Sequence, residues 1–461
     1  MIEALVRRWL PITAIGLLLG GLVRAQRAPG FGADVYLHLR VGAEFLGGWS
    51  IAEPGHFGSF DSQAWYPTQW LTQIGMAWAE QAGGFSGVMW LTGTVICVLA
   101  VTVYLGCRTM AAPLPAALAT IVAIMAATPG LSGRPQILSY ILISIVTTAW
   151  LATARDGKAR WWLVVVNWVW VPLHGMWMIG ILIGVVATIG IALERQHDRR
   201  RVLKLALIPV LSTLVTILTP LGVHVFESVA VVGDRAQFLD EWDPPDFTTP
   251  PAAILAVMIA VILMAAMRRD RVDWPTIMLV GLAIAWSIYT LRTTVVAAVM
   301  LAPILAGTLQ RFVPRGPSIG RAEGAALGAM LVAASCVLVP VANARADDKA
   351  APAWLDGRLD AMPAGTTVLN EFNEGAYFLW RHPQLDLVMH GYADAFTDDE
   401  IVRNVEISVL APGWDREVAE LDVDVALVDP DSPLGYAMTN DLGWTEIEAD
   451  EDFALLSPPT G

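Results

Sequence analysis

Cysteine and charge are both scarce in this sequence. Three of the 461 residues are cysteine, and Asp, Glu, Lys and Arg together make up only 16%. Cys97, Cys107 and Cys336 lie within apolar stretches, so the sequence predicts neither a disulfide framework nor a cysteine zinc site. The C-terminal region has no glycine-rich phosphate loop, and no repeat of fixed period runs along the chain. A disulfide-stapled domain, a P-loop domain and a repeat architecture are therefore excluded.

Apolar residues dominate the first three quarters of the chain. The whole sequence is 55% hydrophobic, with a mean hydropathy of +0.55 and 19 tryptophans. Runs of about 17 to 25 mainly apolar residues, the length that crosses the hydrocarbon core, recur up to about Val341. The expected spans are 10–23, 85–107, 110–128, 135–153, 161–173, 175–193, 203–221, 250–267, 273–290, 293–310 and 323–342. The sequence thus predicts a polytopic α-helical membrane protein with about eleven transmembrane helices.

The distribution of Lys and Arg predicts the orientation of these helices. Residues 1–344 contain 23 Lys and Arg, and 17 of them fall in loops that a cytoplasmic N-terminus places on the cytoplasmic side. Basic clusters flank residues 161–193 on both sides, so this segment is expected to form a hairpin that turns at 173–175. The first span has no small-residue cleavage site and is expected to remain as an anchor. Eleven crossings of the cell membrane then place the C-terminus on the extracytoplasmic face.

Residues 345–461 form a second expected domain, distinct from the membrane domain of residues 1–344. They contain 25 Asp and Glu against 6 Lys and Arg, a net charge of −19 within the −14 of the whole chain. Such acidity argues against nucleic acid and against docking on anionic lipid headgroups. Short β-rich runs at 366–369, 386–389, 423–428 and 453–456 alternate with helical stretches at 374–381, 398–410 and 434–442. This order predicts a small α/β layer domain.

Two loops on the outer face are long, residues 24–84 and 222–249, and function is expected there. The first opens on a stretch in which Leu37, Val41 and Phe45 recur every four residues. This period predicts an amphipathic helix lying along the membrane interface. Asp34 and His38, spaced i and i+4, would share its polar face. Asp34 is expected either to act as a general base or cation ligand, or simply to cap the helix.

Aromatic residues and an acidic run mark the two outer loops. Trp65, Gln69 and Trp70 lie close together in the first loop, where they could form an interface belt or a platform that binds sugar or lipid. The second loop has four acids within seven residues, including Glu241 beside Trp242. Such a run is usually solvated, but Glu241 could instead complete a polar site with Asp34.

Three basic side chains stand at expected outer ends of spans. Arg134 and Arg292 lie so close to hydrocarbon that they should be paired, hydrated or bound to headgroups. Guanidinium groups also suit phosphate, so a lipid-linked phosphate is a natural ligand. His174, at the expected hairpin tip, could contact such a phosphate or cap the turn.

Taken in order, these residues resemble the large bacterial family of polytopic GT-C-type glycosyltransferases, which use polyprenyl-phosphate sugars as donors. The resemblance covers nearly the whole chain. Its motifs are Asp34, His38, Gly42, Pro54, Trp65, 69–71, 134–136, Trp170, 174–175, Pro220, Gly222, 241–245, Arg292, 370–377, 427–429 and 443–444. It implies a GT-C-like transmembrane domain followed by a soluble extracytoplasmic domain.

The resemblance also implies an activity and roles for the site residues. The protein would be an enzyme that moves a sugar from a polyprenyl-phosphate donor to a glycan, lipid or protein acceptor, with membrane lipids around it. Asp34 would be the base, or a ligand with His38 for a divalent cation, and His38 and Glu241 would complete the polar floor. Arg134, Arg292 and His174 would bind the departing phosphate, and Trp65, Gln69, Trp70 and Trp242 would line the substrate site.

The chain departs from the family's pattern at several positions. The family commonly has an acid where Gln69 stands, Asn in place of Pro172 and Thr219, and Asp-Gly-Arg where residues 390–392 read His-Gly-Tyr. Two other functions therefore stay open. A lipid or polysaccharide transporter would show internal repeats and interrupted helices, and a non-catalytic envelope-assembly scaffold would use the acidic tail to bind partners.

Overall fold

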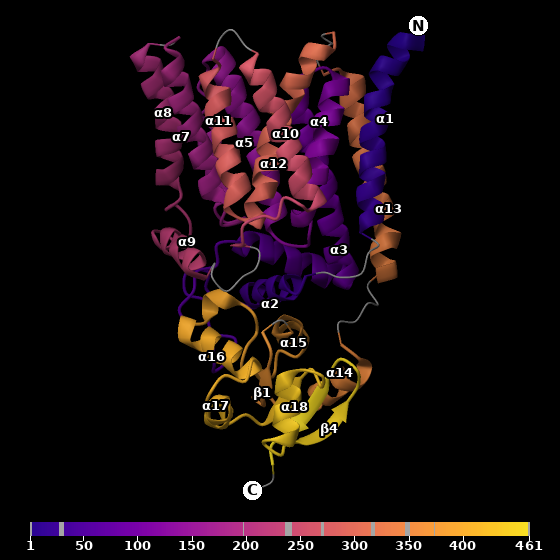
Figure 1. The fold of residues 1–461 in the computed structure, drawn as a ribbon, viewed down its shortest axis with the longest axis vertical. Helices are drawn as coiled ribbons and strands as arrows, with labels where there is room; N and C mark the ends of the chain where they lie inside the picture. The colour runs from indigo at the N-terminus through magenta and orange to yellow at the C-terminus, as the bar shows by residue number, and fades with distance from the viewer. Residues whose placement is uncertain are drawn as a thin grey trace.

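The computed structural model describes residues 2–26, 32–196, 198–235, 242–268, 272–314, 319–345, 351–372 and 374–459. A bundle of long helices forms one end of the molecule, and a small mixed α/β domain forms the other (Figure 1). The helix α2 lies crosswise between the two. The start of the first helix and the C-terminal domain are at opposite ends of the bundle, as an odd number of crossings requires.

Each of the eleven expected spans coincides with a helix in the described part of the chain. The helices are α1 (Ile2–Ala25), α3 (Trp70–Arg108), α4 (Pro113–Ala126), α5 (Gln136–Asp156), α6 (Trp162–Trp170), α7 (Trp177–Glu194), α8 (Arg199–Val215), α10 (Pro250–Met267), α11 (Trp274–Tyr289), α12 (Leu291–Leu309) and α13 (Arg321–Arg345). Six helices of the described residues are long and apolar enough to cross a membrane, and the apolar helices Trp9–Ala25, Pro113–Ala126 and Trp274–Tyr289 are shorter. The polytopic helical fold predicted from hydropathy is confirmed, and the expected hairpin turns between α6 and α7.

The helix α12 lies at the centre of the bundle. It packs against α3, α4, α5, α10 and α11, and 83% of its most apolar window is buried. Small residues make this close approach possible, since Ala297, Ala298, Ala302 and Ala306 are fully buried. The first turn of α12 is therefore held by the surrounding helices, which matters because it carries Arg292.

A kink divides α3 into two parts. Gly83 and Gly84 have non-helical backbone angles, and Gly84 has a φ of 60°, which favours glycine. The kink falls where the first outer loop was expected to end and the span at 85–107 to begin. The part before the kink, which starts at Trp70, packs along α2 (Asp34–Leu46).

The amphipathic helix predicted in the first loop is α2, but its apolar stripe does not face lipid. Leu37, Val41 and Phe45 are buried in one cluster with Leu355, Tyr377 and other residues of the C-terminal domain. The expectation that this helix lies along the membrane interface is therefore wrong for its apolar face. The four-residue spacing of apolar residues identified the apolar face of the helix correctly. That face is buried by the C-terminal domain and not by lipid.

The C-terminal domain is built on a five-stranded sheet in the order β2-β1-β3-β5-β4. The strands are β1 (Thr367–Asn370), β2 (Asp386–Leu387), β3 (Val425–Val428), β4 (Thr445–Ala449) and β5 (Ala454–Ser457). Strands β2, β1 and β3 are parallel, and β5 is antiparallel to both β3 and β4. The helices of the domain are α14 (Ala353–Asp360), α15 (Gly375–Arg381), α16 (Asp398–Ser408), α17 (Trp414–Leu421) and α18 (Pro433–Asn440). The small α/β domain predicted from alternating runs is confirmed.

Contacts along the first outer loop dock this domain onto it. On α2, the ring of Tyr36 lies 5.2 Å from that of Tyr377 and 5.3 Å from that of Trp380, both on α15. Further along the loop, the backbone amide and hydroxyl of Ser59 donate to the carboxylate of Asp386 at 2.9 and 2.6 Å. The loop that carries Asp34 and His38 is thereby fixed against the soluble domain.

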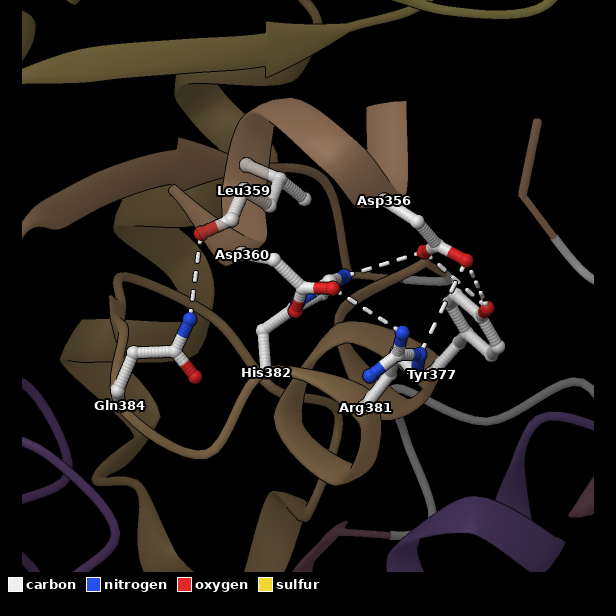
Figure 2. A network of polar contacts seen from close by, with 7 residues as sticks. All are labelled: Asp356, Leu359, Asp360, Tyr377, Arg381, His382 and Gln384. Atoms are coloured by element: carbon white, nitrogen blue, oxygen red, sulfur yellow. Dashed lines mark hydrogen bonds and ion pairs between the residues drawn. The ribbon is translucent and has the colours of Figure 1, made fainter. Parts of the chain in front are cut away.

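A polar network joins α14 to α15 inside the domain (Figure 2). His382 is fully buried, and its Nδ1 and Nε2 lie 2.9 Å from Asp360 and 3.1 Å from Asp356. The hydroxyl of Tyr377 also donates to Asp356 at 3.3 Å, and Arg381 pairs with Asp360 at 3.1 Å. The network therefore links the helix after α13 to the helix that touches α2.

Candidate functional site

Asp34 and Arg134 form an ion pair at the junction of the bundle and the loop. Asp34 is the first residue of α2, and Arg134 stands just before α5. The Nε of Arg134 lies 2.7 Å from Oδ2 of Asp34, and both side chains are partly exposed, at 26% and 37%. The N-cap position of α2 is Ala33, with no side-chain cap. The carboxylate is thus paired with a guanidinium and does not cap the helix.

Arg292 reaches the same segment from α12. Its Nε donates to Oε1 of Gln136 at 3.2 Å, two residues beyond Arg134. A capping box of Thr290 and Thr293 fixes the start of α12 beside it. Arg292 is therefore held two residues from Arg134, although the two arginines are far apart in sequence.

The second outer loop contributes Trp242. The guanidinium carbon of Arg292 lies 5.9 Å from the centre of the Trp242 ring, a cation–π distance. The backbone amide of Leu291 donates to the carbonyl of Asp243 at 2.8 Å. Glu241, the predicted third catalytic residue, lies outside the described residues.

His38 is buried beside both arginines. Only 6% of the residue is exposed. Burial, and then the positive charges of Arg134 and Arg292, lower the pKa of His38 to about 3. The imidazole is therefore neutral at physiological pH. Its Nδ1 lies 3.3 Å from Nε2 of Gln73 on α3.

His174 occupies the turn between α6 and α7. Its Nδ1 accepts a hydrogen bond from the amide of Met176 at 3.2 Å, so it does cap the turn. Burial lowers its pKa well below the ordinary value, and the charges of Arg292 and His38 add to this effect. His174 therefore shares an electrostatic environment with Arg292 and His38. The turn also holds α3, because the carbonyl of Leu173 accepts from the hydroxyl of Thr72 at 2.7 Å.

Asp34, His38, Arg134, His174 and Arg292 therefore gather at one end of the bundle, and we call them the polar cluster.

The aromatic residues of the first loop are placed differently. Trp65 is 3% exposed and packs between Phe57 and Tyr392, with its Nε1 donating to the carbonyl of Gly55 at 3.2 Å. Gln69 is the N-cap residue of α3, and Trp70 is half-buried. The predicted contacts of Trp65, Gln69 and Trp70 with substrate stay predictions.

Sequence reasoning gave no role to Gln73 and none to Gln136 beyond its place in a motif. Gln73 follows Gln69 by one helical turn and is completely buried. A polar side chain repeated at this spacing at the start of an apolar helix was the signal available.

The donor set for a metal is incomplete in the described part of the chain. No group of three or more His, Cys, Asp or Glu there could hold an ion. The carboxylate of Asp34 is paired with Arg134, and Nδ1 of His38 with Gln73. The described residues of the polar cluster thus do not fit a resident divalent cation.

The whole chain has the fold of GT-C-type membrane glycosyltransferases, as expected from the sequence. It is similar to the archaeal oligosaccharyltransferase AglB from Archaeoglobus fulgidus in complex with an inhibitory peptide and a dolichol-phosphate, at 11% identity and a TM-score of 0.61, with 93% of this chain and 70% of that one covered. It is also similar to ArnT from Cupriavidus metallidurans bound to undecaprenyl phosphate, at 14% identity and a TM-score of 0.57, with 97% of each chain covered. At such identities the likeness shows the fold alone.

A third similar structure, the Archaeoglobus fulgidus oligosaccharyltransferase in complex with Zn and sulfate, has 12% identity and a TM-score of 0.50, covering 92% of this chain and 69% of that one. That structure holds zinc in a similar fold. No protein-family model and no curated protein matches the chain.

Proposed function

We propose that this protein is a membrane glycosyltransferase that transfers a sugar from a polyprenyl-phosphate donor to an acceptor on the extracytoplasmic face of the cell membrane. The observation that carries the proposal is the pairing of Asp34 with Arg134 beside Arg292. One carboxylate and two guanidinium groups from three distant segments meet where the bundle joins the soluble domain. The similar solved structures, of which one is in complex with a dolichol-phosphate and another is bound to undecaprenyl phosphate, support this class of donor.

Arg134 and Arg292 would bind the phosphate of the donor. A phosphate that leaves an anomeric carbon gains negative charge in the transition state, and guanidinium groups stabilise that charge by paired hydrogen bonds. Their location at the end of the bundle suits a ligand whose prenyl chain stays in the membrane. Trp242 would hold the Arg292 guanidinium in place through its ring.

Asp34 would act as the general base. Its partner Arg134 can turn to the incoming phosphate, which frees the carboxylate. The acceptor hydroxyl then gives its proton to Asp34 while its oxygen bonds to the anomeric carbon. The bond from that carbon to the phosphate oxygen breaks, and the phosphate departs with the electron pair. A single displacement of this kind inverts the anomeric configuration.

The other predicted site residues take supporting roles in this proposal. Glu241 would extend the polar floor from the second loop, and His174 would help to form the phosphate site. Gln69 and Trp70 would line the approach to the acceptor, and Trp65 would support that wall from behind. No step passes through a metal, because the two guanidinium groups already supply positive charge beside the leaving group.

The test is transfer of radiolabelled sugar from a panel of polyprenyl-phosphate donors by the purified protein in nanodiscs. Asp34→Asn removes the base and keeps the size of the side chain, so transfer should fall by at least 100-fold, the scale of a lost general base. Its matched control is Asp415→Asn, a substitution at an exposed position on α17 of the C-terminal domain. Transfer that survives in Asp34→Asn would refute the assignment of the base, and silence with every donor and acceptor would argue for the scaffold function.

A further inference from the structure

Gln73 lies between the polar cluster and the C-terminal domain. Its side chain is 0% exposed, and its amide oxygen accepts no hydrogen bond from the described residues. On one side, its Nε2 contacts Nδ1 of His38 at 3.3 Å. On the other side is Tyr392, which follows β2 in the soluble domain. Burying an amide costs free energy unless hydrogen bonds replace those lost from water, so the hydrogen bonds of Gln73 bear on the stability of this contact.

Tyr392 also makes a side-chain hydrogen bond with Gln73. Burial raises the pKa of Tyr392 well above its ordinary value, and the charge of Asp394 adds to the rise. A hydrogen bond with Gln73 opposes it. The Tyr392 ring also meets the Trp65 ring at 4.8 Å, so its position is fixed from the first loop as well. Gln73 is therefore held by a rigid neighbour.

In this structure the nitrogen of the Gln73 amide, and not its oxygen, faces Nδ1 of His38 at 3.3 Å, and this orientation bears on which ring nitrogen carries the proton. An amide nitrogen only donates hydrogen bonds, so Nδ1 of His38 must be the acceptor, with the amide oriented as it is here. The proton of the neutral ring then lies on Nε2. Within the described residues, the ring of His38 makes its hydrogen bond at Nδ1, and its Nε2–H group is the donor that a ligand of the polar cluster would meet.

We infer that Gln73 is a positioning residue that holds His38 as a neutral donor with its proton on Nε2, and that Tyr392 of the C-terminal domain holds Gln73. The position of the proton does not depend on the proposed function. Only the identity of the ligand that Nε2–H would meet rests on it. In this state His38 can donate to an oxygen of the phosphate or sugar. It offers no lone pair to take up the acceptor proton or to bind a cation, which leaves Asp34 as the base.

The test reads the proton position directly. The full-length protein is labelled with ¹⁵N-histidine in nanodiscs, and the His38 signals are identified by their loss in His38→Gln. We expect a pyridine-type signal from Nδ1 and a pyrrole-type signal from Nε2 in the unsubstituted protein. A pyrrole-type Nδ1 would overturn the inference at once.

Three substitutions sharpen the test. In Gln73→Glu the carboxylate accepts from Nδ1, so the pyrrole-type signal should move to Nδ1. In Gln73→Leu the donor is lost, so both tautomers should be populated. In Tyr392→Phe the amide loses its anchor, so the signals should shift partway toward the mixture. Unchanged His38 signals in Gln73→Glu and Gln73→Leu would refute the role of Gln73, and unchanged signals in Tyr392→Phe would refute the coupling to the C-terminal domain.

These outcomes are independent of whether the protein transfers sugar. Binding of undecaprenyl phosphate to the same nanodiscs reports on the proposed function, since it depends on Arg134 and Arg292. Normal binding with unchanged His38 signals would reject only Gln73 as the positioning residue. Absent binding with the expected signals would reject only the proposed function.

Discussion

Gly42 of α2 lies so close to Gln73 of α3 that a Cβ atom at Gly42 would overlap the Gln73 carbonyl oxygen. The added atom would also meet Cβ of Ala77 at 2.9 Å. The two helices can approach this closely only because residue 42 has no side chain. Their distance in turn fixes His38, one turn before Gly42, against the amide of Gln73.

Gly42→Ala is therefore expected to push α2 away from α3 and to destabilise the protein by about 1–3 kcal/mol, as overpacking does. Thermal unfolding of the protein in detergent should show a lower midpoint, and any sugar transfer should fall with it. Gly75→Ala on α3 is the matched control, because its Cβ would meet nothing within 4 Å. Equal midpoints for the two variants would contradict this account of the contact.

Arg292→Gln is expected to weaken the binding of undecaprenyl phosphate by about 10- to 100-fold, because a charge-assisted hydrogen bond contributes about 1.5–3 kcal/mol. The measurement is a binding isotherm in nanodiscs. Arg311→Gln, just past the other end of α12, is the control and should leave binding unchanged. A similar loss in both variants would indicate nonspecific attraction of the anion.

Asp356→Asn is expected to lower the free energy of unfolding of the C-terminal domain by about 1–3 kcal/mol, because it removes an ionised partner from buried His382 and from Tyr377. Heating the full-length protein while following cleavage by a protease would detect this as earlier digestion of the domain. Glu448→Gln breaks the exposed pair with Arg358 and should cost no more than about 1 kcal/mol. Digestion at the same temperature in both variants would show that the buried network does not stabilise the domain more than the exposed ion pair does.

Glu374 should make the stability of the domain depend on pH. Burial, and then the charges of Glu371, Asp429 and Asp452, raise the pKa of Glu374 to about 7. The folded state therefore binds more protons than the unfolded state, and this contribution to stability is lost as the pH rises through 7. Glu374→Gln mimics the protonated acid, so its melting midpoint should exceed that of the unsubstituted protein at pH 8 and match it near pH 5.

The pKa of Asp450 is shifted in the opposite direction to that of Glu374, so its contribution to stability should depend on pH in the opposite way. A hydrogen bond from the Trp354 indole is the main reason that the pKa of Asp450 lies below its ordinary value. Its contribution to stability is present at neutral pH and is lost as the pH falls, so Asp450→Asn should lower the midpoint at pH 8. The difference in melting midpoint from the unsubstituted protein should therefore have opposite signs at pH 8 for Glu374→Gln and Asp450→Asn. Differences of the same sign would contradict the link between pKa and stability described for both residues.

The spans, the α/β tail and the residues of the polar cluster could be predicted because each leaves a local mark. A run of apolar residues must cross the membrane, and a charge at its edge must find a partner or water. The partners were not predictable. The pairing of Asp34 with Arg134 depends on how α2 and α5 pack, and nothing local in either segment specifies it.

The cover of α2 was missed for a related reason. An apolar stripe looks the same in sequence whether it faces lipid or another domain. Leu37 and Val41 meet residues more than 300 positions away, and only the folded chain brings these together. Gln73 was passed over because a glutamine in the first turn of a helix is ordinary, and its burial comes from Tyr392 and α2.

The cover of α2 by the C-terminal domain also has a consequence for biosynthesis. Residues 34–46 leave the ribosome early, yet the surface that buries their apolar stripe belongs to residues 351–457, which leave last. Throughout synthesis of the bundle, α2 lacks its partner. A chain that stopped after α13 would therefore carry α2 with its apolar stripe uncovered.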